Sequence, residues 1–212
     1  MPDGGSVVVA HGLWMTGLEA TLLRRRLADR GYAVRQFHYR SMTAMPEDVL
    51  AELRAEVLAL PPPVHLVGHS LGGLLLLRFG AAHPELPLGR MVLLGSPVNG
   101  SRAARAFAAL PGASLFFGHL AGSALLATGR ARWQGTTAVG VIAGNHSLGF
   151  GRFIGHLPEP NDGTVSVDET ELDGAADHLV LPVSHTGLLV SEEVVEATVR
   201  FLSSGRFAAP AP

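Results

Sequence analysis

The pentapeptide Gly-His-Ser-Leu-Gly at positions 68–72 constrains this chain more than any other segment. An apolar run, 64–67, precedes it and a second apolar run, 71–77, follows it, so Ser70 is expected at a sharp turn from a buried strand into a helix. Such a turn strains the serine backbone, and the flanking glycines leave room for it. The hydroxyl is then exposed above the sheet, and the Leu71 N–H lies at a helix start, where it can bind an oxyanion. Ser70 is therefore predicted to be a nucleophile.

The rest of the chain alternates short apolar, β-branched runs with helical patterns, which is typical of parallel βαβ units. We expect strands at 6–10, 33–38, 64–68, 90–95, 137–143 and 178–181, and helices at 18–30, 46–60, 71–83 and 192–202. Several of the strands are nearly all apolar, as expected where helices cover both faces of a sheet. The pattern predicts a single α/β domain over residues 1–212, with a mainly parallel six-stranded sheet flanked by helices on both faces.

Composition excludes several classes of function. The chain has no cysteine, which rules out disulfides, thiolate metal ligands and a cysteine nucleophile. All 16 basic residues are arginines, the net charge is −2, and only 24–26 forms a basic cluster, so we expect no nucleic-acid partner. The histidines lack metal-site spacing and there is no phosphate-loop lysine. We therefore expect neither a metal nor a cofactor.

The amino-terminal residues lack the basic and apolar regions of a signal peptide, and no apolar run approaches the roughly 18 residues of a transmembrane helix. We expect a cytoplasmic protein without an integral membrane segment. Export of a processed form and the oligomeric state stay open.

A second segment, His11-Gly12-Leu13-Trp14, directly follows the first expected strand. A carbonyl under attack needs two hydrogen-bond donors, and one of them commonly comes from a loop after an early strand. Gly12 would let this loop approach the serine closely, and the Leu13 N–H is the expected second donor beside Leu71. His11 is expected to brace the loop through hydrogen bonds.

With these two segments the chain resembles the α/β-hydrolases, and within that superfamily the small bacterial lipases and esterases. The resemblance covers residues 7 to about 202 and implies the chain order nucleophile, acid, histidine. It implies that His185, between the last expected strand and the last helix, is the base. Asp162, in the Asn-Asp-Gly-Thr segment 161–164, is the implied acid, with Asp168 as the first alternative.

The segment 97–135 is rich in Ala, Gly and Leu and is longer than a single short helix needs. It is expected to form either a small helical cap over the site or additional helical packing. The candidate substrate contacts are the apolar residues near the two motifs and two phenylalanines of this segment: Trp14, Met15, Leu74, Phe116 and Phe117. Such walls suit an acyl chain.

The sequence and the resemblance together predict a serine hydrolase that cleaves carboxylic esters of small molecules or lipids through an acyl-enzyme. An acyltransferase or a thioesterase acting on lipid or carrier-bound acyl groups would use the same residues. A non-catalytic binding protein with this fold is a further alternative, although such a protein would be expected to have lost some of these residues.

Overall fold

The computed structural model of the chain describes residues 4–112, 118–148 and 157–208. Six strands form one sheet in the order β2-β1-β3-β4-β5-β6, and every neighbouring pair is parallel. The strands are β1 (Ser6–Ala10), β2 (Ala33–Phe37), β3 (Val64–His69), β4 (Leu88–Leu94), β5 (Val139–Gly144) and β6 (Asp177–Leu181). The predicted six-stranded parallel α/β fold is confirmed.

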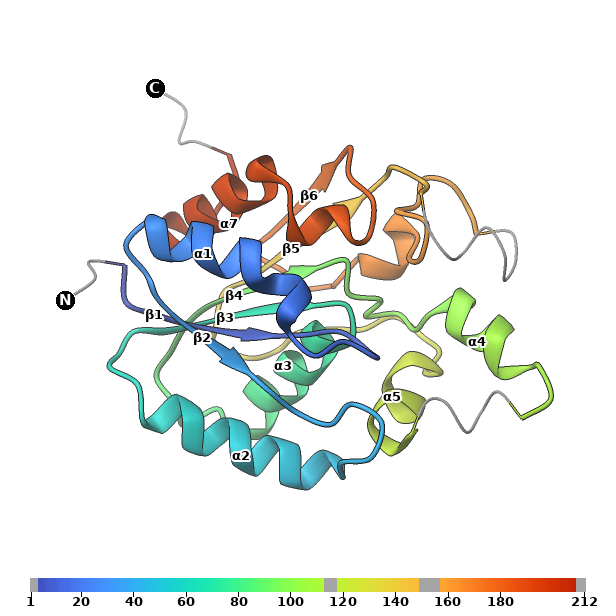
Figure 1. The fold of residues 1–212 in the computed structure, drawn as a ribbon, viewed down its shortest axis with the longest axis horizontal. Helices are drawn as coiled ribbons and strands as arrows, with labels where there is room; N and C mark the ends of the chain where they lie inside the picture. The colour runs from blue at the N-terminus through green and yellow to red at the C-terminus, as the bar shows by residue number, and fades with distance from the viewer. Residues whose placement is uncertain (1–3, 113–117, 149–156, 209–212) are drawn as a thin grey trace.

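Helices cover both faces of the sheet (Figure 1). One face packs against α2 (Pro46–Leu58) and α3 (Leu71–Ala82), and the other against α1 (Thr21–Asp29) and α7 (Glu192–Ser204). Successive residues of a strand point to opposite faces. In β1, Val8 joins the core beneath α2 and α3, whereas Val7 and Val9 join the core beneath α1 and α7. Because both faces are buried, the central strands are apolar throughout.

The ends of most expected elements differ from the observed ends by one or two residues. The expected helix 18–30 is divided into a 3-10 turn (Leu18–Ala20) followed by α1. The α7 helix continues two residues beyond its expected end and stops before Gly205, whose φ of 81° suits a left-handed C-cap. The β4 strand begins at Leu88 rather than at residue 90, because Leu88 pairs with Val64. Tertiary pairing and capping, rather than local preference, set these ends.

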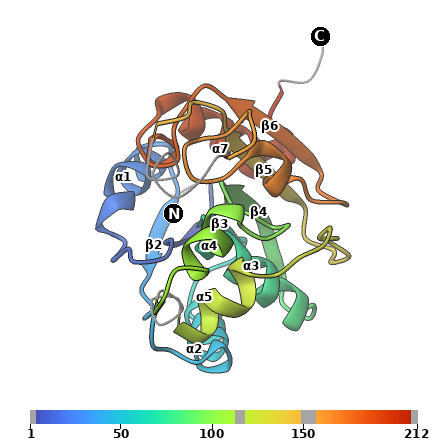
Figure 2. The same ribbon diagram turned by 90° about the vertical axis from the view of Figure 1, so that its right-hand side faces the viewer.

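Two short helices of the segment 97–135, α4 (Arg102–Ala108) and α5 (Gly118–Leu125), lie beyond the carboxyl ends of the strands (Figure 1). Figure 2 looks onto these strand ends, with α4 and α5 in front of β3 and α3. In open α/β sheets, ligands bind at the carboxyl ends of the strands. Within the described ranges, no helix has both the length and the hydropathy needed to cross a membrane.

Candidate active site

Ser70 lies at the turn between β3 and α3, with a backbone φ of 53° and ψ of −121°. A positive φ is rare for residues other than glycine and is a known form of strain at functional sites. The flanking glycines make this turn feasible. A Cβ atom on Gly68 would lie 2.5 Å from the Cα of Gly73, and one on Gly72 would collide with the carbonyl oxygen of Ala10. The two glycines of the pentapeptide are therefore required sterically.

Asp162 holds the imidazole of His185. Its Oδ2 lies 2.7 Å from Nδ1 of His185, and its Oδ1 accepts the backbone N–H groups of Thr164 and Val165 at 2.9 and 2.7 Å. The carboxyl group is buried, with 1% of the residue exposed. Three hydrogen bonds to one buried carboxylate fix its position. Because a carboxylate oxygen accepts, Nδ1 of His185 is the donor of this hydrogen bond, and Nε2 is left to accept.

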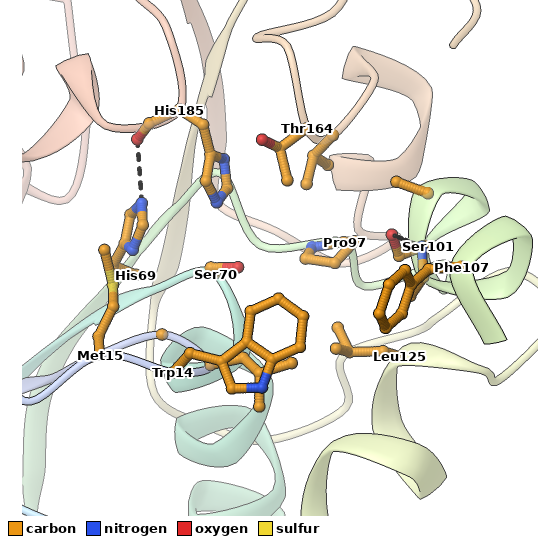
Figure 3. Close-up of a pocket in the computed structure, with 15 residues that line it drawn as sticks. Trp14, Met15, His69, Ser70, Pro97, Ser101, Phe107, Leu125, Thr164 and His185 are labelled. Atoms are coloured by element: carbon orange, nitrogen blue, oxygen red, sulfur yellow. Dashed lines mark hydrogen bonds between the residues drawn. The ribbon is translucent and has the colours of Figure 1, made fainter. Parts of the chain in front are cut away.

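His185 and Ser70 line the same cavity, although they lie far apart in the sequence, Ser70 between β3 and α3 and His185 after β6. Figure 3 shows the His185 ring above Ser70, with one ring nitrogen turned toward the serine, whose hydroxyl points into the cavity. This arrangement can move a proton from a serine hydroxyl to an imidazole whose second nitrogen is held by a carboxylate.

Asp168, the alternative acid, lies elsewhere. It is in a 3-10 turn (Val167–Thr170), and its carboxylate forms a two-point ion pair with Arg102 at 3.0 and 2.7 Å. The Arg102 guanidinium lowers the pKa of Asp168. Half of the Asp168 side chain is exposed, and the ion pair joins this turn to α4. The structure therefore brings Asp162, and not Asp168, to His185.

The loop after β1 lies against Ser70. A Cβ atom placed on Gly12 would come within 3.3 Å of the Ser70 Cβ, so the close approach expected of this glycine is present. The N–H of Leu71, at the first position of α3, and the N–H of Leu13 donate to no other described residue. Two donors at these places suit a developing negative charge on oxygen.

His11 is buried at the start of this loop. Its Nδ1 lies 2.9 Å from the carbonyl oxygen of Gly12, and its ring stacks on Tyr39 with centroids 4.3 Å apart. The Tyr39 hydroxyl donates to the His11 carbonyl oxygen at 2.6 Å. Burial lowers the pKa of His11, so the ring is neutral at pH 7. These contacts give His11 the bracing position that the sequence suggests.

The cavity beside Ser70 has a volume of about 360 Å³ and extends from the serine toward α4 and α5 (Figure 3). Its walls are mostly apolar: Gly12, Leu13, Trp14, Met15, His69, Ser70, Pro97, Ser101, Ala103, Ala104, Phe107, Leu125, Thr164, Val165 and His185. Among the described residues, no group of three or more His, Asp or Glu side chains could hold a metal ion. The cavity suits an apolar group joined to a polar centre that reacts at Ser70.

Trp14 forms one wall of this cavity from an unusual backbone conformation. Its backbone φ is 58°, and Trp14 and Ser70 are the two non-glycine residues with a positive φ in the described part of the chain. The Trp14 residue is 55% exposed. The indole N–H donates to the sulfur of Met42 at 3.0 Å, and the ring meets Phe107 edge to face with centroids 6.0 Å apart. Trp14 thus links the loop after β1 to α4.

The family follows from a comparison with known proteins. The model of the alpha/beta hydrolase family matches residues 7–200. The chain belongs to the alpha/beta hydrolase family. A search of curated proteins finds no match to this hydrolase.

Solved structures share the fold of this hydrolase. The mature lipase BlEst2 of Bacillus licheniformis is similar with a TM-score of 0.75 and 20% identity, covering 95% of this chain and 93% of that chain. Phospholipase PlaB of Legionella pneumophila gives a TM-score of 0.66 and 14% identity, covering 97% of this chain and 58% of that chain. The Vlm2 thioesterase domain gives a TM-score of 0.62 and 15% identity, covering 95% of this chain and 92% of that chain. At these identities the likeness shows the fold alone.

The predicted substrate contacts of the hydrolase fall into three groups. Trp14 and Met15 line the cavity. Leu74 does not line it, because one turn of α3 carries its side chain away from Ser70 and against the core beneath α2 and α3. Phe116 and Phe117 lie outside the described residues. In the described part of the chain, Phe107 of α4 and Leu125 of α5 form the aromatic and aliphatic far wall.

Phe107, Leu125 and Ser101 were not singled out from the sequence. The apolar composition of 97–135 pointed to the segment but could not say which of its side chains face the serine. That choice depends on how α4 and α5 sit over the strand ends, which no local pattern encodes.

Proposed function

We propose that this chain is a serine hydrolase that cleaves carboxylic esters, with Ser70 as nucleophile, His185 as general base and Asp162 as the residue that orients the base. One observation carries the proposal. His185, which Asp162 holds through a 2.7 Å hydrogen bond, lines the same mostly apolar cavity as Ser70, a serine at a strained strand-to-helix turn. A buried carboxylate, an imidazole and an exposed serine hydroxyl in this order are the requirements of acyl transfer.

The reaction would begin when Nε2 of His185 accepts the proton of the Ser70 hydroxyl as its oxygen attacks the ester carbonyl. Asp162 stabilises the imidazolium that forms. The Leu13 and Leu71 N–H groups would donate to the oxyanion, whose collapse expels the alcohol with the proton from His185. The acyl group then remains on Ser70. A water molecule, deprotonated by His185, attacks this acyl-enzyme, and the carboxylic acid leaves as Ser70 recovers its proton.

The substrate class follows from the cavity walls. Trp14, Met15, Phe107 and Leu125 offer apolar contact to an acyl chain, and no Asp, Glu or Arg side chain from the described part of the chain lines the cavity. We propose that 97–135 acts as a cap, because α4 supplies one wall and α5 another. Phe116 and Phe117 of the same segment stay predicted contacts.

The test is a panel of p-nitrophenyl esters from acetate to dodecanoate, assayed with the wild type and with Ser70→Ala. Removing the serine hydroxyl is expected to lower kcat by several orders of magnitude. Circular dichroism should show that the variant keeps its fold, since the hydroxyl is not packed in the core. Hydrolysis by Ser70→Ala near the wild-type rate would overturn the assignment of the nucleophile.

The same groups would serve a thioesterase or an acyltransferase acting on lipid or carrier-bound acyl groups. The panel therefore includes an acyl thioester and a set with a primary alcohol as acceptor. A kcat/KM for the thioester far above that of the matched oxygen ester would favour the thioesterase. Transfer to the alcohol faster than hydrolysis would favour the acyltransferase.

A further inference from the structure

One buried histidine beside the nucleophile has no part in the mechanism above. His69 ends β3 and directly precedes Ser70, and only 2% of it is exposed. Its side chain turns away from the serine hydroxyl. Nε2 of the ring lies 3.0 Å from the backbone carbonyl oxygen of His185, the hydrogen bond drawn in Figure 3. The two rings are 4.6 Å apart.

The protonation of His69 follows from this partner. A carbonyl oxygen can only accept, so Nε2 must carry the hydrogen. Nδ1 then presents a lone pair, and it is buried with no hydrogen-bond partner among the described residues. Burial, together with the nearby His185, lowers the pKa of His69 to about 3. At pH 7 a ring with this pKa is a neutral donor, and it places no second positive charge beside the base.

The backbone and side chain of His185 are held at three points. Asp162 provides two of them, through Oδ2 to Nδ1 at 2.7 Å and through its carbonyl oxygen to the His185 N–H at 2.9 Å. Both contacts tie His185 to the loop that carries the acid. The third contact, from His69, runs to the strand that carries the nucleophile. It spans 116 positions of sequence and joins the residue next to Ser70 directly to the base.

We propose that His69 is a positioning residue, whose Nε2–H holds the loop of His185 against the nucleophile turn and so keeps the imidazole within reach of the Ser70 hydroxyl. The inference rests on the proposed function of Ser70 and His185. Without this bond, Asp162 would still orient the ring, but no other hydrogen bond among the described residues would tie His185 to the nucleophile turn. A displacement of about 1 Å at a reacting group can cost about 100-fold in rate.

The first test compares His69→Leu, which removes the donor, with His69→Gln, whose amide nitrogen can occupy the place of Nε2. With p-nitrophenyl butyrate, His69→Leu is expected to lower kcat by about 10- to 100-fold and to change KM by less than about threefold. His69→Gln should recover most of kcat. The matched control is His65→Leu, which removes another buried histidine four residues earlier on β3, and it should leave kcat unchanged.

The second test separates positioning from a general loss of structure. A residue that acts through His185 should have no effect once His185 is gone. In a His185→Ala background, where about 10³–10⁴-fold catalysis over water typically remains, adding His69→Leu should leave the residual rate unchanged. An equal loss from His69→Leu in both backgrounds would overturn the proposal, as would a wild-type kcat for His69→Leu.

If His69→Leu fails to fold, His69→Asn takes its place, because its shorter amide cannot reach the His185 carbonyl oxygen. A kcat for His69→Asn equal to that of His69→Gln would then overturn the proposal. The proposed function fails separately, if Ser70→Ala or His185→Ala keeps wild-type activity. Loss of activity in both of those variants, with full activity in His69→Leu, would reject only the role of His69.

Discussion

Asp162 holds His185 through both its side chain and its backbone, with Oδ2 2.7 Å from Nδ1 and the carbonyl oxygen 2.9 Å from the His185 N–H. The other carboxylate oxygen, Oδ1, is already occupied by two backbone N–H groups, from Thr164 and Val165. The carboxylate therefore cannot rotate without breaking hydrogen bonds. Its Oδ1 is held by the backbone, and its Oδ2 holds the ring of His185.

This geometry makes Asp162→Asn informative. The asparagine oxygen would stay with the two backbone donors, which leaves the NH₂ group facing Nδ1 of His185. Nδ1 must then accept, the proton moves to Nε2, and the base has the wrong tautomer. We expect kcat to fall by about 10³- to 10⁴-fold with KM little changed. Asp168, the half-exposed alternative acid, gives the control, because Asp168→Asn should change kcat by less than about twofold. The reverse ranking would show that the acid is misassigned.

The strain at Ser70 predicts a difference between two inactive variants. Alanine at position 70 must keep the φ of 53°, whereas glycine adopts it without a steric penalty. We expect Ser70→Gly to exceed Ser70→Ala in free energy of unfolding by about 1 kcal/mol, after allowing for the greater freedom of glycine in the unfolded chain. Urea denaturation followed by circular dichroism measures this difference. Equal stabilities would show that the strain is relieved elsewhere.

The place of Phe107 in the cavity wall predicts selectivity for chain length. Replacing Phe107 by alanine removes apolar contact worth about 1–3 kcal/mol to an acyl chain that reaches α4, and nothing to an acetyl group. The ratio of kcat/KM for octanoate over acetate esters should fall about tenfold. Leu110→Ala is the matched control, because Leu110 follows α4, is exposed and does not line the cavity. An unchanged ratio in Phe107→Ala would place the acyl chain elsewhere.

His65 predicts a loss of stability in acid. Burial, with a smaller effect of Arg90, lowers its pKa from 6.5 to about 4. As the pH falls from 6.5 toward 4, the unfolded chain binds a proton that the folded chain refuses, so the free energy of unfolding decreases. In His65→Gln that contribution is absent. Between pH 6.5 and 4.5 the variant should lose about 2 kcal/mol less than the wild type, measured by urea denaturation. If the free energy of unfolding falls equally with pH in the wild type and in His65→Gln, the lowered pKa of His65 would be contradicted.

The sequence by itself determined the parts of this protein that depend on local chemistry. A serine between two glycines can lie between a buried strand and a helix only at a turn of this kind, so the strand, the turn and α3 could be predicted together. The alternation of apolar strands with helices was enough for the parallel sheet, because strands covered on both faces must be apolar throughout. The glycine of the loop after β1 likewise indicated a close approach.

Tertiary structure alone decided which distant residues meet. Asp162 and Asp168 lie six positions apart, and although the resemblance favours Asp162, local sequence preferences alone do not show which of them meets His185. Asp162 meets His185, because its loop follows β5 beside β6, while a 3-10 turn carries Asp168 to Arg102. Phe107 reaches the cavity and Leu74 does not, because helix placement over the strand ends sets which side chains face the serine. The bond from His69 to His185 has the same origin, since it joins the end of β3 to the loop after β6, which lie together only in the folded chain.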